Sequence, residues 1–247
     1  DCALMLQSIA GQDPADATSS ALPVPDYVAG LARPVKGLRI GVPTAYFRDN
    51  LDPAIETLLD ASLDAFRSLG CEIVNIAIPD MDAWNRAATA IIAAEAAAMH
   101  ANWLRDRPQD YSDQLRARLE IGAGVTAIQY LNALRLRDAA LKTWLAEVMS
   151  NVDVVHAPVV AFATPTIADT DVGGGAKMNE LMALVTRLMR PVNYLGLPSL
   201  AVPCGFQPHG LPCDFQLIGR PFDEGQLFRL GHAYQRATDW HTRRPTS

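Results

Sequence analysis

Apolar and polar positions change from a strand-like to a helical period and back within the first third of the chain. Residues 38–42 form a short apolar run that predicts a buried strand. Asp52 and Pro53 then suit a helix N-cap and first helical residue, and apolar positions from 55 to 66 recur with helical period. Residues 71–78 predict a second strand. This order predicts two parallel strands joined by a right-handed crossover.

Helical periodicity dominates residues 82–149, with breaks near Pro108 and near residues 122–124. Residues 103–120 are rich in charge and predict an exposed layer. Residues 126–149 carry an amphipathic stripe that predicts one helical face packed against the rest of the protein. We therefore expect a long helical insertion between the second and third strands.

The remaining segments again mix strands and helices. We expect a strand at 152–156, a loop at 157–176 that contains a Gly-Gly-Gly run, a helix at 178–189, strands at 199–204 and 215–218, and a helix at 224–238. The short connection at residues 206–210 predicts an antiparallel pair. The sequence thus predicts an α/β fold in which a mixed β-sheet is flanked by helices.

The first residues predict a helix that leads into a polar, proline-rich linker. We therefore divide the chain into a terminal helix with its linker, residues 1–37, and an α/β part, residues 38–247. The helical pattern begins on Asp1, without an initiator methionine or a capping segment before it. This start leads us to expect that the chain is part of a longer protein.

Charge and cysteine content narrow the functional class. The net charge is −6, from 21 basic and 27 acidic residues, and no basic patch of the kind that binds nucleic acid is visible. No apolar run reaches the roughly 18 residues of a membrane span, so we expect no membrane partner. The four cysteines are irregularly spaced and predict reduced, mostly buried thiols in a cytoplasmic protein. They are Cys2, Cys71, Cys204 and Cys213.

No metal or organic cofactor is expected. Glu95 and His100 are the nearest approach to a metal pair, but a separation of five residues puts them on different faces of a helix. His156 falls inside a strand and predicts a core residue instead of a general base. The glycine run at 173–175 is not followed by the Lys-Ser/Thr pair of a phosphate-binding loop.

Two C-terminal segments carry a family resemblance. Residues 190–206 read RPVNYLGLPSLAVPCGF, and residues 210–224 read GLPCDFQLIGRPFDE. Weaker agreement extends over residues 36–43, 95–100 and 153–158. Together these segments resemble the C-terminal half of the amidase signature family, whose members are serine-dependent hydrolases of carboxamides. The resemblance implies the C-terminal part of that family's fold.

The resemblance also implies a catalytic centre of two serines in a Gly/Ser-rich segment and a lysine upstream of it. No such segment occurs in this sequence. The pair Ser19-Ser20 lacks flanking glycines and lies in the linker, and Lys36, Lys142 and Lys177 match no catalytic position of the family. We therefore assign no catalytic residue. We expect an amidase that forms carboxylate and ammonia through an acyl-serine intermediate, with residues 1–247 inactive alone.

The family's C-terminal half walls the acyl pocket, which suggests four substrate-binding residues. They are Met189, Asn193 and Tyr194, on the loop that we expect before the Gly-Leu-Pro turn, and Arg118 in the helical insertion. Asn193 also fits a purely structural amide, and Arg118 fits an ordinary exposed helical arginine. In the glutamine-using amidotransferases of this family an acidic residue binds the amino group of glutamine near this point, and Thr186 stands there in this chain.

A second hypothesis comes from another class of protein. In it the chain is a non-catalytic binding or assembly module, or a fragment of the A subunit of an amidotransferase. In either case the expected partners are a small amide substrate of the full-length protein and the missing N-terminal half. Removal of half of a shared sheet predicts an unpaired strand edge, exposed apolar surface and a tendency to self-associate. The particular amide and the oligomeric state do not follow from the sequence.

Overall fold

The computed structural model describes residues 1–173 and 175–244. Within that part a single five-stranded sheet has the order β2-β1-β3-β5-β4. The strands are β1 (Arg39–Pro43), β2 (Glu72–Ile76), β3 (Val154–Pro158), β4 (Ser199–Phe206) and β5 (Pro212–Ile218). All five correspond to strands expected from the apolar runs.

The sheet is mixed, as expected. Strand β1 pairs in parallel with both β2 and β3, whereas β5 runs antiparallel to β3 and to β4. The side chain of Asp153 supports the entry to β3, because its Oδ2 atom accepts a hydrogen bond from the backbone N–H of Arg39 at 2.7 Å. The β4–β5 ladder carries a bulge between Pro203 and Gly205.

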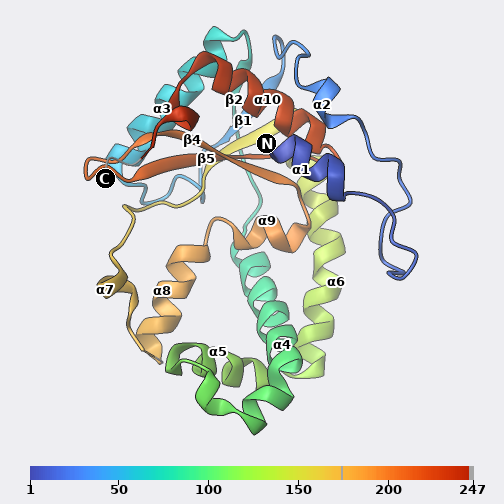
Figure 1. The fold of residues 1–247 in the computed structure, drawn as a ribbon, viewed down its shortest axis with the longest axis vertical. Helices are drawn as coiled ribbons and strands as arrows, with labels where there is room; N and C mark the ends of the chain where they lie inside the picture. Colours follow the sequence, from blue (N-terminus) through green and yellow to red (C-terminus); the bar gives the residue numbers. More distant parts are fainter. Residues whose placement is uncertain (174, 245–247) are drawn as a thin grey trace.

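Helices cover both faces of the sheet (Figure 1). They are α1 (Cys2–Ile9), α2 (Tyr27–Gly30), α3 (Pro53–Ser68), α4 (Asp82–Asp106), α5 (Asp113–Ala123), α6 (Ala127–Thr143), α7 (Ile167–Thr170), α8 (Ala176–Thr186), α9 (Arg190–Leu195) and α10 (Glu224–Ala237). Short 3-10 turns follow α4 and α10, and a π-helical turn, η2 (Trp144–Val148), continues α6. The expected helical insertion is confirmed as α4, α5 and α6.

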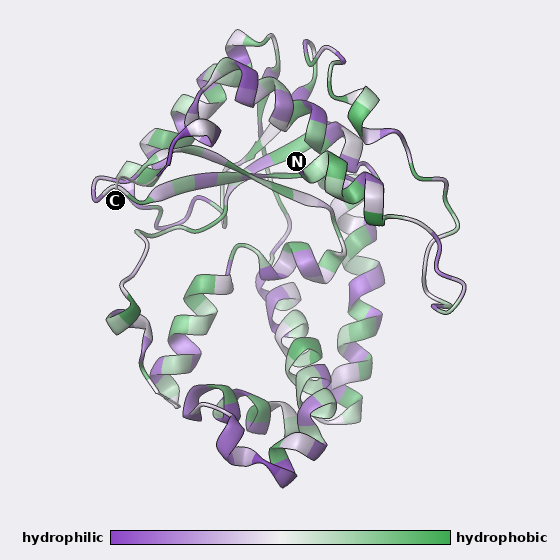
Figure 2. Cartoon of the chain, viewed as in Figure 1, coloured by the Kyte–Doolittle hydropathy of each residue, from purple (hydrophilic) through white to green (hydrophobic). Residues whose placement is uncertain are grey.

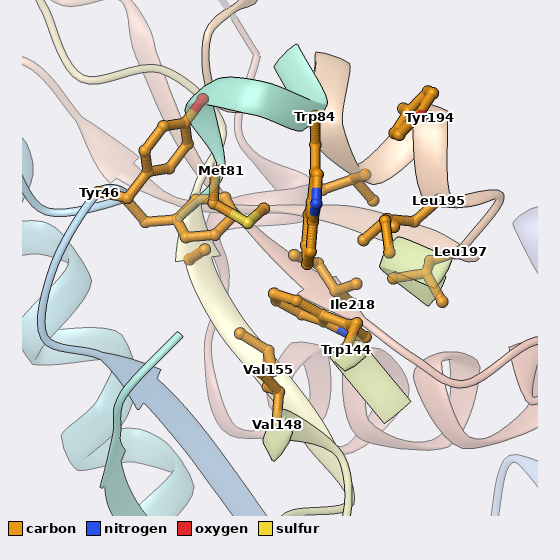
Figure 3. Packing of buried hydrophobic residues seen from close by; sticks show 14 of the residues in the cluster. Tyr46, Met81, Trp84, Trp144, Val148, Val155, Tyr194, Leu195, Leu197 and Ile218 are labelled. Carbon is orange, nitrogen blue, oxygen red and sulfur yellow. The ribbon is translucent and has the colours of Figure 1, made fainter. Parts of the chain in front are cut away.

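Two hydrophobic cores lie on opposite faces of the sheet. One core joins α3 and α10 to the sheet through residues such as Phe66 and Tyr234. The other core joins α4, η2 and α9 to the opposite face, and Figure 3 shows Trp84, Trp144 and Ile218 packed within it. Successive side chains of a strand point to opposite faces, so those of β3 alternate between the two cores, and β3 is buried on both faces.

The insertion extends away from the sheet. In Figure 1 helices α4 and α6 run down from the sheet layer, α5 closes their far end, and α8 stands opposite α4. Figure 2 shows that these helices carry hydrophobic and hydrophilic residues side by side. Every helix among the described residues is too short or too polar to span a bilayer.

The segment around Asn193 was wrongly predicted to be a loop. Residues Arg190–Leu195 form helix α9, with Pro191 in its first turn and Gly196 at its C-cap in the left-handed conformation (φ 70°). The preceding helix, expected at residues 178–189, ends earlier at Thr186. Of the glycine run expected in a loop, Gly174 lies outside the described residues.

Candidate functional site

A cavity of about 700 Å³ lies between helices α4, α5, α8 and α9. Each of these helices turns one face toward it. The lining residues are Asp82, Asn85, Arg86, Thr89, Ile92, Ala93 and Ala96 of α4, Leu115, Arg118, Leu119 and Ile121 of α5, Met178, Asn179, Met182, Ala183 and Thr186 of α8, and Met189, Arg190 and Asn193 at α9. This volume suits a small organic ligand.

The residues of α4 that line the cavity change from polar to apolar along the helix. Its lining residues follow helical spacing, so they form one continuous stripe that extends for about 21 Å along the helix axis. The polar members, such as Asn85 and Thr89, lie toward the start of the helix, and Ile92, Ala93 and Ala96 lie further along it. One end of the cavity therefore offers hydrogen-bonding groups and the other offers apolar surface.

Arg190 holds the polar end together. Its Nη1 atom donates to Oδ1 of Asn85 at 2.9 Å. Its Nη2 atom donates to the carbonyl oxygen of Met182 at 3.3 Å and to the hydroxyl of Thr186. Burial lowers the pKa of Arg190 most, and the nearby charge of Arg118 lowers it further. One guanidinium thus ties the start of α9 to both α4 and α8.

Tyr46 supports this end from the loop after β1. Its hydroxyl accepts a hydrogen bond from Nδ2 of Asn85 at 3.2 Å and donates to the carbonyl oxygen of Arg187 at 2.8 Å. The guanidinium of Arg187 lies 4.3 Å above the ring. Burial raises the pKa of Tyr46, which keeps the phenol neutral. Tyr46 also has a positive φ of 59°, a conformation that its contacts must hold in place.

Gly122 sets the separation of α5 from α4. A Cβ atom at this position would lie 2.0 Å from the carbonyl oxygen of Ala93 and 2.9 Å from the Cβ of Ala97. Only glycine allows the two backbones to approach so closely. Because Arg118 and Leu119 stand one turn before Gly122 on α5, this close approach fixes their position in the cavity wall.

The structure brings together three of the four residues that the sequence suggested for substrate binding. Met189, Asn193 and Arg118 all line the cavity. Tyr194 does not line it, because its side chain is buried and its hydroxyl donates to the carbonyl oxygen of Ala133 on α6 at 2.6 Å. Thr186 lines the cavity and accepts from Arg190.

Several lining residues were missed by the sequence analysis. Asn85 and Arg190 organise the polar end, and Met178 and Met182 face the cavity from α8. A signal was present in part: the polar residues Asp82, Asn85 and Thr89 recur with helical spacing at the start of a helix whose later residues are mostly apolar. The sequence does not show that this stripe faces α8, because that contact depends on packing between residues far apart in the chain.

The hydroxyl and carboxylate groups that line the cavity are those of Thr89, Thr186 and Asp82. Among the described residues no serine, cysteine, histidine or lysine lines it. The Ser19-Ser20 pair lies elsewhere, in a linker turn where Ser19 bonds to the backbone of Asp13. His156 is completely buried beside Ser62 on the α3 face of the sheet.

Glu95 and His100, the two residues considered for metal binding, form hydrogen bonds with different tyrosines. Glu95 accepts a hydrogen bond from the hydroxyl of Tyr130 at 2.9 Å, and Nδ1 of His100 lies 2.9 Å from the hydroxyl of Tyr111. In residues 1–173 and 175–244 no group of three or more His, Cys, Asp or Glu side chains could hold a metal ion.

Sequence comparisons point to one family. The sequence model of the family described as Amidase matches residues 1–228. An amidase of Pseudomonas putida is 40% identical over 246 residues, which are 99% of this chain and 52% of that protein. The A subunit of glutamyl-tRNA(Gln) amidotransferase of Chloroflexus aggregans (strain MD-66 / DSM 9485) is 36% identical over 265 residues, 99% of this chain and 54% of that protein. The chain spans about half the length of these relatives.

Solved structures agree. A protein of a vestigial complex that reveals the evolutionary origins of an s-triazine catabolic enzyme superposes with a TM-score of 0.80 at 30% identity, over 95% of this chain and 50% of that one. The 6-aminohexanoate cyclic dimer hydrolase in complex with its substrate superposes with a TM-score of 0.82 over 98% of this chain and 54% of that one. At 21% identity the second likeness concerns the fold alone.

Proposed function

Because the chain belongs to the amidase family, we propose that it is the acyl-binding part of an enzyme that hydrolyses a carboxamide to a carboxylate and ammonia. The observation that carries this proposal is the cavity between α4, α5, α8 and α9, which is apolar along most of its length and polar at one end. A concave apolar site with a few convergent polar groups is the usual form of a small-molecule site.

In this proposal the nucleophile comes from outside residues 1–247. Two serines and a lysine of the amidase signature would form and hydrolyse the acyl-serine intermediate, since a serine hydroxyl attacks an amide only when a neighbouring base takes its proton. The present chain contributes the wall that positions the acyl group beside that serine. Correct positioning of the reacting carbonyl lowers the barrier without any further chemistry. The chain alone is therefore inactive.

The residues divide into contact and support roles. Met189 contacts the body of the acyl group, Asn193 offers its amide to a polar atom of the substrate, and Arg118 supplies a positive charge at the wall. Tyr194 supports the wall from behind through its bond to Ala133. Arg190 is already occupied by Asn85, Met182 and Thr186, so its role is to hold the helices together.

A second candidate is a role within an amidotransferase, favoured by the 36% identity to the A subunit of such an enzyme. Against it stands the position of Asp82, which carries the one carboxylate among the described lining residues. Asp82 lies at the polar end of the cavity, on the side of the amide group and away from the α-ammonium group of a bound glutamine. An amino-acid amide such as glutamine needs a carboxylate beside its ammonium group. The unbridged state of all four cysteines supports a place in the reducing cytoplasm for either function.

The test is ammonia release from a panel of carboxamides by the natural gene product that contains residues 1–247, combined with labelling by a fluorophosphonate serine reagent. We expect release and labelling with the natural product and neither with residues 1–247 alone. Peptide mapping should place the label outside residues 1–247. A label within these residues, or a natural product that neither reacts with the reagent nor releases ammonia, would contradict the proposal.

A further inference from the structure

Three methionines define one wall of the cavity. Met178 and Met182 are four residues apart and therefore share a face of α8, and Met189 follows before α9. Met178 is completely buried, and the other two are half-buried. Of the seven methionines in the chain, these three face a single cavity.

Methionine makes this wall adaptable. The side chain is unbranched with three rotatable bonds, and its polarizable sulfur makes favourable contacts with aromatic rings. Across the cavity the wall consists of stiffer aliphatic and small residues, among them Ile92, Leu119 and Ile121. A ligand held between these surfaces gains from apolar area and is not required to have one particular outline.

The charges around the cavity have one predominant sign. Arg86, Arg118 and Arg190 line it together with a single carboxylate, that of Asp82. Within the described residues Arg118 makes no hydrogen bond or ion pair, whereas Arg190 bonds only to neutral acceptors. The field in the cavity is therefore positive, which disfavours a cationic ligand and tolerates a neutral or anionic one.

From these observations we propose that the cavity takes acyl groups that are apolar, aromatic or alkyl, and uncharged or anionic, and that it rejects α-amino acyl groups such as that of glutamine. This inference rests on the proposed function, in which the cavity receives the acyl part of an amide. The amide end lies toward Asn85 and Asn193, and the apolar body lies against Met178 and Met182.

Methionine methyl NMR tests this directly, because it requires no catalysis. The natural gene product that contains residues 1–247 is labelled at the methionine methyl carbons. It is then titrated separately with 4-phenylbutyramide, 4-phenylbutyrate, glutamine and 2-phenylethylamine. We expect the first two probes to shift the signals of Met178, Met182 and Met189. Glutamine and 2-phenylethylamine should leave them in place up to the solubility limit. Assignment uses single Met→Leu variants.

The other methionines are internal controls. Met81 and Met149 are buried in the core beside the sheet, and Met5 and Met99 are exposed outside the cavity. Their signals should not move with any probe, and the dispersion of the two core signals reports that the protein is folded. Shifts of the cavity methyls by glutamine as large as those by 4-phenylbutyramide, or no shift with either phenyl probe, would overturn the proposal.

A matched pair of variants locates the binding. Met182→Leu keeps an apolar side chain of similar size and should retain affinity for 4-phenylbutyramide within about threefold. Met182→Lys adds a charge to the cavity and should weaken binding about tenfold or more, whereas Met99→Lys on the exposed face of α4 should not. If Met182→Lys does not fold, the double variant Met178→Leu/Met189→Leu shows whether the shifted signals belong to the cavity.

The result is separable from the proposed function. If the phenyl probes bind but the natural gene product hydrolyses no carboxamide, the cavity assignment stands and the hydrolase proposal fails. If the gene product hydrolyses glutamine in preference to 4-phenylbutyramide, the hydrolase proposal stands and the present inference fails.

Discussion

The Nε2 atom of His156 lies 2.9 Å from the Oγ atom of Ser62, and both side chains are buried between β3 and α3. The same Oγ atom lies 2.6 Å from the carbonyl oxygen of Leu59. A hydroxyl has one proton, so Ser62 donates to this carbonyl and accepts from the imidazole N–H. His156 also stacks on Phe215, with ring centroids 4.6 Å apart. The pair therefore has a structural role.

Removal of this hydroxyl should destabilise the fold. The variant Ser62→Ala leaves the imidazole N–H of His156 without an acceptor in a buried site, which costs about 1–3 kcal/mol of unfolding free energy. Urea unfolding monitored by circular dichroism measures the loss. The control Ser68→Ala, on the exposed side of the same helix, should change stability by less than about 0.5 kcal/mol. Equal effects of the two substitutions would contradict the structural role.

The same histidine should make stability depend on pH. Burial lowers the pKa of His156 to about 3, from an ordinary value of 6.5. Between these values the unfolded chain binds a proton that the folded protein does not. The free energy of unfolding should therefore fall as the pH drops from about 6.5 toward about 3, with a contribution of up to about 1.4 kcal/mol per pH unit.

The variant His156→Gln measures this contribution. Unfolding free energies of the variant and the parent, compared from about pH 7 to about pH 4, should show a flatter dependence in the variant. His209→Gln, on the exposed β4–β5 turn, is the control and should follow the parent curve. An equal pH dependence in the parent and in His156→Gln would contradict the lowered pKa of His156.

Substitution at Gly122 should disturb the cavity through helix packing. In Gly122→Ala the new methyl group would overlap the carbonyl of Ala93, so α5 must move away from α4. We expect a loss of about 1–3 kcal/mol in stability, by analogy with overpacked cores, and weaker binding of 4-phenylbutyramide. Gly124→Ala is the matched control, since its methyl group would lie 3.4 Å from the nearest atom. Similar melting temperatures for both variants would contradict the tight crossing.

Replacement of Arg190 should loosen α8. Lysine keeps the charge but cannot bond to Asn85, Met182 and Thr186 together, because it lacks the planar fork of arginine. Arg190→Lys should therefore increase amide hydrogen exchange in α8 about tenfold or more, while exchange in the sheet stays unchanged. Arg86→Lys, a lining residue on the exposed side of α4, serves as the control. Unchanged exchange in α8 would show that other contacts hold it.

Exposed apolar side chains should make residues 1–247 bind a hydrophobic dye. Met5 and Ile9 on α1 are 63% and 70% exposed, and Ile128 on α6 is 73% exposed. The variant Ile128→Gln should reduce dye fluorescence and self-association in light scattering, with a change of less than about 0.5 kcal/mol in stability. Arg135→Lys on the same helix should change neither. A monomer that binds no dye would contradict this prediction.

The candidate site was only partly visible in the sequence. Met189, Asn193 and Arg118 came from the resemblance to amidases, and all three line the cavity. Tyr194 came from the same source but turns into the core, because a helical turn points neighbouring side chains in different directions. The segment that carries these residues was expected to be a loop, although Pro191 and Gly196 are typical of a helix start and end.

Local patterns were enough to predict the strands, the helical insertion and the mixed sheet, because periodicity and turn residues act over a few neighbouring positions. The family was predicted from the resemblance of residues 190–206 and 210–224 to the amidase signature family. The meeting of helix faces could be seen only in the folded chain. Met182 and Asn85 are far apart in the chain and become neighbours of one cavity because Arg190 bridges α8 and α4. Such contacts depend on the summed packing of many residues, which no local pattern encodes.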